Sequence, residues 1–190
     1  MSTTPESVPV EAASGFHDPT SAGFTRSFEG RLLFWIAEFF SIFQIATAAH
    51  LIDFPSQVQR AFHVGFLLLL TFPLIALQKS APYKIIAWVL ALSAFLIAGY
   101  QWIEYEPLLL RAGDPTELDI YLGIVALTTV FVATWQLMGP ALPIICGTFF
   151  AYCLFGQYLP APFDHRGYDV HQVIEHMAYG TEGIYGIPTY

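Results

Sequence analysis

The chain has 190 residues, of which 55% are hydrophobic and only 12% are charged. Its mean hydropathy of +0.55 is far above that of ordinary soluble domains. The formal net charge is −8, and only seven residues are Lys or Arg. Nucleic acid is therefore excluded as a partner, because binding to a phosphate backbone requires clustered basic side chains.

The first 30 residues form a polar, acidic leader that is rich in Ser, Thr, Pro and Gly. Such a segment cannot bury enough apolar surface to fold, so residues 1–30 are predicted to be a disordered tail. We expect no secretory signal here, because the first apolar run begins late and is longer than a signal core.

Five long apolar runs follow the leader, and each has the length of a transmembrane helix. A helix that rises about 1.5 Å per residue needs about 20 residues to cross a hydrocarbon core of roughly 30 Å. The runs lack strand-like alternation, and lipid offers no partner to exposed backbone groups, so helices are expected. The sequence predicts an all-α, polytopic membrane protein with a short interfacial segment at its C-terminus. The runs are Leu32–Ile52, Ala61–Leu77, Ile85–Ile103, Ile120–Met138 and Ala141–Leu159.

The loops between the runs predict the orientation of the chain. Five spans place the N-terminal tail and the second-to-third loop on one side of the membrane. Because this side carries slightly more basic residues, it is predicted to be cytoplasmic. Arg26, Arg31, Lys79 and Lys84 lie on this side, against Arg60, Arg111 and Arg166 on the other. The short Gly139-Pro140 connection predicts an antiparallel hairpin of the fourth and fifth runs.

Small and aromatic residues occupy positions that predict how the helices pack. Small residues three or four positions apart on the third and fifth runs favour close helix contacts. They are Ala87, Ala91, Ala94 and Ala98 on the third run, and Gly147 and Ala151 on the fifth. Amphipathic aromatic side chains near span ends are typical of membrane-interface anchors. These are Trp88, Tyr100, Trp102, Tyr105 and Trp135.

The first run carries a row of polar side chains at steps of three residues. The row consists of Glu38, Ser41, Gln44, Thr47 and His50. A carboxylate inside a span usually faces a partner or a wet cavity, so Glu38 could belong to an ion or proton path. The alternative is interhelical packing, because polar side chains hold membrane helices together and Glu38 lies within about two turns of the cytoplasmic end. Glu38, Gln44 and His50 are the candidates for intramembrane polar packing.

Histidines are the remaining candidates for ligands. His171, Glu175 and His176 follow the last run, but their spacing is not the H-E-x-x-H pattern that places two histidines on one helix face for zinc. His50 and His63 flank one short loop. No Ser-His-Asp arrangement, phosphate loop or Cys metal cluster is present, so we expect no enzyme, no metal site and no cofactor. The alternative function from another class is the membrane anchor of a redox enzyme, binding haem or quinone through these histidines.

Several short motifs after about residue 105 occur together in a specific order. They are Arg111-Ala-Gly-Asp-Pro-Thr-Glu-Leu-Asp119, Gly139-Pro-Ala-Leu-Pro-Ile-Ile145, Phe155-Gly-Gln-Tyr-Leu-Pro160, His165-Arg-Gly-Tyr168 and Thr181-Glu-Gly-Ile-Tyr-Gly-Ile-Pro188. Together they resemble the N-terminal part of the fused permeases of tripartite ATP-independent periplasmic (TRAP) transporters, commonly of the TAXI branch. The resemblance covers residues 31–190, loosely in the first three runs and closely thereafter. Where such permeases often carry two arginines, this chain has Trp135 and Gln136.

The resemblance implies a domain layout and a set of partners. Residues 31–138 would form a four-helix Q-like scaffold, 139–160 a connector helix, and 161–190 the periplasmic start of an M-like transport portion. The chain would sit in a bacterial or archaeal inner membrane, with a cytoplasmic N-terminus. Its partners would be the M-like portion, a periplasmic solute-binding protein and the lipid bilayer, in ion-coupled symport without ATP.

The same resemblance implies that no substrate-binding residue lies in this chain. In the family, the M-like portion carries the substrate site, the sodium sites and the moving elevator domain, and no position here matches those residues. By itself, the chain is not expected to transport. A further alternative is a membrane protein that acts only as a docking platform for other subunits.

Overall fold

The computed structural model describes residues 27–186, and every regular element within that range is helical. Five of the helices are long and apolar enough to cross a membrane, which confirms the predicted fold class. The leader lies outside the described residues except for its last four positions. The elements are α1 (Phe28–Ala48), α2 (Ser56–Ala76), α3 (Ala81–Ile103), α4 (Tyr105–Leu110), α5 (Glu117–Met138), α6 (Ala141–Phe155), η2 (Gly156–Tyr158) and α7 (Val170–Tyr179).

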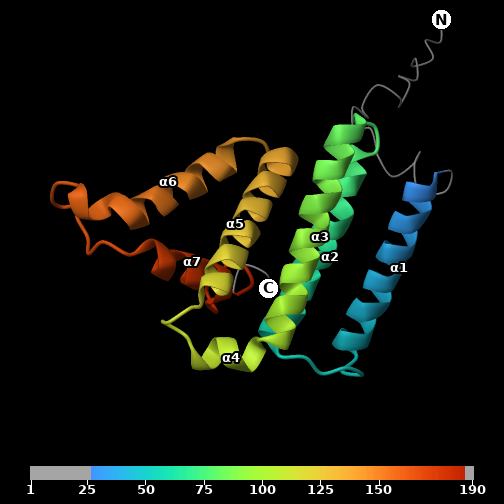
Figure 1. The fold of residues 1–190 in the computed structure, drawn as a ribbon, viewed down its shortest axis with the longest axis horizontal. Helices are drawn as coiled ribbons and strands as arrows, with labels where there is room; N and C mark the ends of the chain where they lie inside the picture. The colour runs from blue at the N-terminus through green and yellow to red at the C-terminus, as the bar shows by residue number, and fades with distance from the viewer. Residues whose placement is uncertain (1–26, 187–190) are drawn as a thin grey trace, which may run out of the picture.

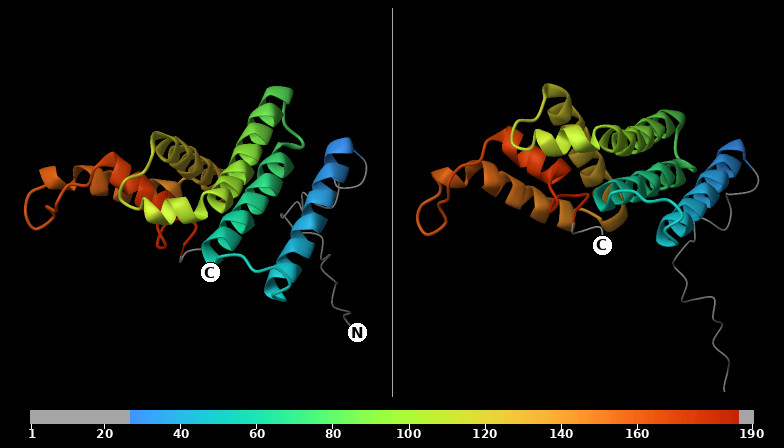
Figure 2. Two further views of the ribbon diagram at one scale, coloured as in Figure 1. Left: turned by 60° about the horizontal axis from the view of Figure 1, so that its bottom comes forward. Right: turned by 90° about the horizontal axis from the view of Figure 1, so that it is seen from below.

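The long helices form a row in which neighbouring helices run in opposite directions. Figure 1 shows α1, α2, α3 and α5 in this row, with α6 leaving the far end of α5. Two further views place α1 and α6 on opposite flanks of the molecule (Figure 2). The contact between α2 and α3 is the most extensive in the fold. The row therefore has a tightly packed centre and two lightly attached flanks.

Small side chains let α2 and α3 approach closely. A Cβ atom added to Gly65 of α2 would lie 3.1 Å from the Cβ of Ala98 and 3.4 Å from the Cα of Phe95. All four alanines of the predicted stripe on α3 are buried, which confirms that prediction. Aromatic rings fill the space beside them, with the Phe66 and Phe95 centroids 4.9 Å apart. The equivalent stripe on α6 differs, because Ala151 is exposed.

The first helix begins and ends earlier than the apolar run predicts. The Ser27 side chain accepts a hydrogen bond of 3.0 Å from the Gly30 backbone N–H and so caps the helix. The helix ends at Ala48, and His50 adopts a positive φ of 53° in the turn that follows. Glu38 therefore becomes the central residue of the 21-residue α1. It lies about 15 Å from either end of the helix, and not near the cytoplasmic end as the sequence predicts.

The C-terminal helices differ from the predicted hairpin. Gly139 has a φ of 78°, which reverses the chain between α5 and α6 as expected. However, α6 diverges from α5 instead of packing along it, and α7 lies in the space between them (Figure 1). Val173 and Ile174 of α7 are buried, and a Cβ on Gly123 of α5 would lie only 2.7 Å from Ile174 Cγ2. The apolar face of this short helix, predicted as an interfacial segment, is thus covered by α5.

Replacing Gly65 with Leu should destabilise the protein by about 1–3 kcal/mol, the range typical of overpacked cores. The new side chain would collide with the α3 backbone at Phe95. Thermal unfolding of the purified chain in detergent measures the effect. Gly99→Leu is the matched control, because nothing lies within 4 Å of a Cβ at Gly99. Equal melting temperatures for the two variants would contradict this packing.

Candidate functional site

A cluster of hydrogen-bonded polar side chains lies where the end of α3, the loop after α4 and the start of α5 meet. Its centre is Asp119, which is 0% exposed and sits in the first turn of α5. The Thr116 side chain caps this helix, and Asp119 bonds back to the Thr116 backbone to complete a capping box. Local sequence thus places the carboxylate, and the loop before it supplies the cation.

Arg111 binds two carboxylates at once. Its Nε lies 2.9 Å from Asp119 Oδ2, and its Nη2 lies 2.9 Å from Asp119 Oδ1, which is bidentate pairing. Its Nη1 donates to Glu104 Oε2 at 3.0 Å. Hydrogen bonding to Asp119 raises the pKa of the Arg111 guanidinium above its usual value. Arg111 therefore stays charged and holds the α3–α4 corner against the start of α5.

Two tyrosines extend the cluster to other helices. Tyr100 Oη on α3 donates to Asp119 Oδ1 at 2.5 Å. Tyr179 Oη on α7 donates to the Asp119 backbone carbonyl at 2.8 Å. Burial raises the pKa of the Tyr179 hydroxyl, so it remains a neutral donor. The cluster therefore joins α3, α4, α5 and α7.

The chemistry of Asp119 is that of a structural brace. Its two oxygens receive hydrogen bonds from the Tyr100 hydroxyl, from two nitrogens of Arg111, and from both the backbone N–H and the hydroxyl of Thr116. An ionised carboxylate offers about four acceptor positions, so these donors occupy all of them. No acceptor position is left for a transported cation or a relayed proton.

The sequence-based expectations include none of the contacts of this cluster. Tyr100 was predicted to be an interface anchor, whereas the structure shows its hydroxyl bound to Asp119 and Arg111. The available signal was the Thr-Glu-Leu-Asp capping box at residues 116–119, preceded by the single arginine of that loop. The partners on α3 and α7 are distant in the chain, and no local pattern indicates them.

The structure separates the polar row predicted on the first helix. Glu38 is exposed on α1. Gln44 forms a hydrogen bond with His63 and so links α1 to α2. Ser41 and Thr47 donate to carbonyl groups of their own helix. His50 lies beyond the end of α1, with its side chain 86% exposed and its Nδ1 3.5 Å from Asp53 Oδ1.

The histidines proposed as alternative ligands are not gathered into one site. His171 and His176 are exposed on α7. Glu175 accepts a hydrogen bond of 2.5 Å from the Gly113 backbone N–H and so attaches α7 to the α4–α5 loop. Within residues 27–186, no group of three or more His, Cys, Asp or Glu side chains could hold a metal ion.

Comparison of the chain with models of protein families, with curated protein sequences and with solved structures finds no match.

Replacing Arg111 with Gln should lower the free energy of unfolding by about 3 kcal/mol, because it leaves the buried Asp119 carboxylate unpaired. The lower end of the usual range applies, since the Arg111 side chain keeps 24% of its exposure. The measurement is thermal or denaturant unfolding in detergent at neutral pH.

Arg166→Gln is the control, because the Arg166 side chain is exposed and outside the cluster. Replacing both members of the pair, as Arg111→Met with Asp119→Leu, should recover part of the loss by removing both buried charges. If Arg111→Gln unfolded at the same temperature as Arg166→Gln, the Arg111–Asp119 pair would contribute nothing to the stability of the fold.

Proposed function

We propose that this chain is the membrane scaffold portion of a TRAP-type secondary transporter permease. In this role it braces a mobile M-like transport portion, which takes its solute from a periplasmic binding protein in sodium- or proton-coupled symport. The chain would cross a bacterial or archaeal inner membrane several times, with its N-terminus in the cytoplasm. The ordered motifs after residue 105 support the resemblance to this family, and the arrangement of the helices supports the role of a scaffold.

The observation that carries the scaffold role is the position of Glu38. It is exposed at the centre of α1, and its outward neighbours Trp35 and Phe39 are 67% and 61% exposed. Insertion of a charged side chain at the centre of a transmembrane helix costs about 2.5–3.5 kcal/mol. Lipid can cover the aromatic rings but does not satisfy a carboxylate. A protein partner against this face of α1 does, and the proposal assigns that place to the M-like portion.

The cluster around Asp119 also fits a scaffold better than a transport site. It lies within one of the motifs that carry the resemblance, yet its carboxylate has no free acceptor position. A transport site must release its ion, whereas this arrangement holds four helices in one geometry. The brace therefore accounts for the Arg111–Asp119 motif without assigning it to the coupling ion.

The first test is whether a partner exists. DNA beyond the codon for Tyr190, or the adjacent reading frame, should encode a long hydrophobic segment of M-like type. Co-expression of both parts should yield a complex that takes up solute when its binding protein is added. If the DNA contains no such segment, the transporter proposal loses its moving half and is wrong.

Glu38→Gln should reduce the recovery of that complex, because the exposed carboxylate provides part of the contact. The complex that does form should keep the wild-type ratio of ions to solute, measured by uptake into proteoliposomes. Glu106→Gln is the control, since Glu106 is exposed on α4 outside the five long helices. Normal assembly of Glu38→Gln with lost ion coupling would place Glu38 in an ion path instead.

An absorbance spectrum separates this proposal from the redox-anchor alternative. The purified chain should show no Soret band, because His63 is engaged by Gln44 and His50 pairs with Asp53. A Soret band that disappears in His63→Ala would favour a haem-binding anchor and contradict the scaffold role.

A further inference from the structure

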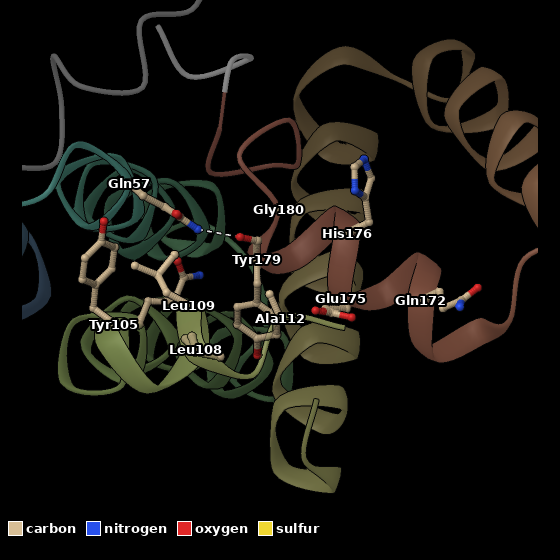
Figure 3. A pocket seen from close by; sticks show the side chains of 11 residues that line it. Gln57, Tyr105, Leu108, Leu109, Ala112, Gln172, Glu175, His176, Tyr179 and Gly180 are labelled. Atoms are coloured by element: carbon tan, nitrogen blue, oxygen red, sulfur yellow. Dashed lines mark hydrogen bonds between the residues drawn. The ribbon is translucent and has the colours of Figure 1, made fainter. Parts of the chain in front are cut away.

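A cavity of about 320 Å³ lies beside the brace, between the end of α3, α4 and α7. Leu108 and Leu109 form one wall, and Glu175 and His176 lie on the α7 side (Figure 3). At its α2 side, Gln57 Nε2 donates to the Tyr179 backbone carbonyl at 2.7 Å. This volume is at the lower end of the range of small-molecule pockets, about 300–1,000 Å³.

The deepest polar group of the cavity is Gln101, in the last turn of α3. The residue is only 2% exposed, and neither its side-chain Nε2 nor its Oε1 has a hydrogen-bond partner in the described part of the chain. Buried amides are almost always satisfied, because an unmade hydrogen bond leaves the full loss of hydration uncompensated. An amide with both a free donor and a free acceptor therefore indicates that a group from outside the chain completes it.

The exposed fractions of the lining residues distinguish the floor of the cavity from its mouth. Gln101 is almost completely buried, whereas Leu109 is 55% exposed. Gln172 and His176 are exposed as well. Gln101 therefore lies on the inner side of the cavity, and these exposed side chains lie on its outer side.

The charges around the cavity decide what kind of ligand fits. Its titratable lining groups are Tyr105, Glu175, His176 and Tyr179, and none of its lining residues is Lys or Arg. The nearby Arg111 directs its guanidinium at Asp119 and Glu104. An anionic ligand would meet the Glu175 carboxylate without a compensating cation. The leucines and the Tyr105 ring, in turn, favour an apolar body.

From these observations we infer that the cavity is a binding site for a small uncharged molecule with a primary amide on an apolar body. The ligand's N–H donates to Gln101 Oε1, and its carbonyl accepts from Gln101 Nε2, so both unpaired atoms are satisfied together. The apolar part lies against Leu108 and Leu109. This inference does not depend on the transporter proposal, because the site is built entirely from residues of this chain.

The test compares two probes of nearly equal shape, benzamide and benzoate. Binding to the full chain in lipid nanodiscs is measured by saturation-transfer NMR, with empty nanodiscs as the blank. Benzamide should bind at least tenfold more tightly than benzoate. Gln101→Leu should weaken benzamide binding at least tenfold, whereas Gln78→Leu, an exposed position after α2, should leave it unchanged.

Two further measurements distinguish a loss of benzamide binding from a loss of folding. Gln101→Leu should melt at or above the wild-type temperature, because it removes two unpaired buried polar atoms. Leu109→Trp, which fills the mouth of the cavity, should also block benzamide while keeping Gln101. The inference is overturned if benzamide does not bind, if benzoate binds equally well, or if Gln101→Leu retains full binding. A lower melting temperature for Gln101→Leu also overturns it, since the amide would then be bonded within the protein.

Discussion

The buried pairing of Asp119 with Arg111 is the constraint on which one half of the structure depends. A carboxylate that is 0% exposed is tolerated only when its acceptor positions are filled. The donors come from α3, from the α4–α5 loop and from the start of α5, while Tyr179 of α7 binds the backbone at the same residue. These segments must therefore all lie next to Asp119, and this requirement fixes the positions of α4 and α7.

Two neighbouring residues at the end of α3 have opposite surroundings, one fully hydrogen-bonded and the other with an unpaired side-chain amide. Tyr100 donates to Asp119, whose acceptor positions are all filled. The next residue, Gln101, lines the cavity and has two side-chain atoms without a hydrogen-bond partner among residues 27–186. Adjacent residues on a helix point about 100° apart, so one turn of α3 can serve both environments. The brace fixes the helix, and the fixed helix holds Gln101 at the floor of the cavity.

The other half of the molecule is organised by close backbone packing between α2 and α3, with α1 more lightly attached at its edge. Gly65 and the alanines of α3 allow α2 and α3 to form a tight pair. By contrast, α1 is attached mainly by aromatic contacts, by the Gln44–His63 hydrogen bond and by the 2.8 Å ion pair of Glu29 with Lys84. Its outer face carries the exposed Glu38 at the middle of the helix.

The sequence by itself determined the number of spans and the alanine stripe on α3. These features depend on residues close together in the chain, through run length and small-residue spacing, and the capping box of α5 is a local signal of the same kind that the sequence-based expectations did not use. Tertiary structure alone decided that α7 packs on α5, that α6 diverges and that Tyr100 binds Asp119. It also decided that the Gln101 amide has no partner within the described part of the chain. Such features depend on donors, acceptors and surfaces brought together from distant parts of the chain. A local sequence pattern therefore cannot predict them.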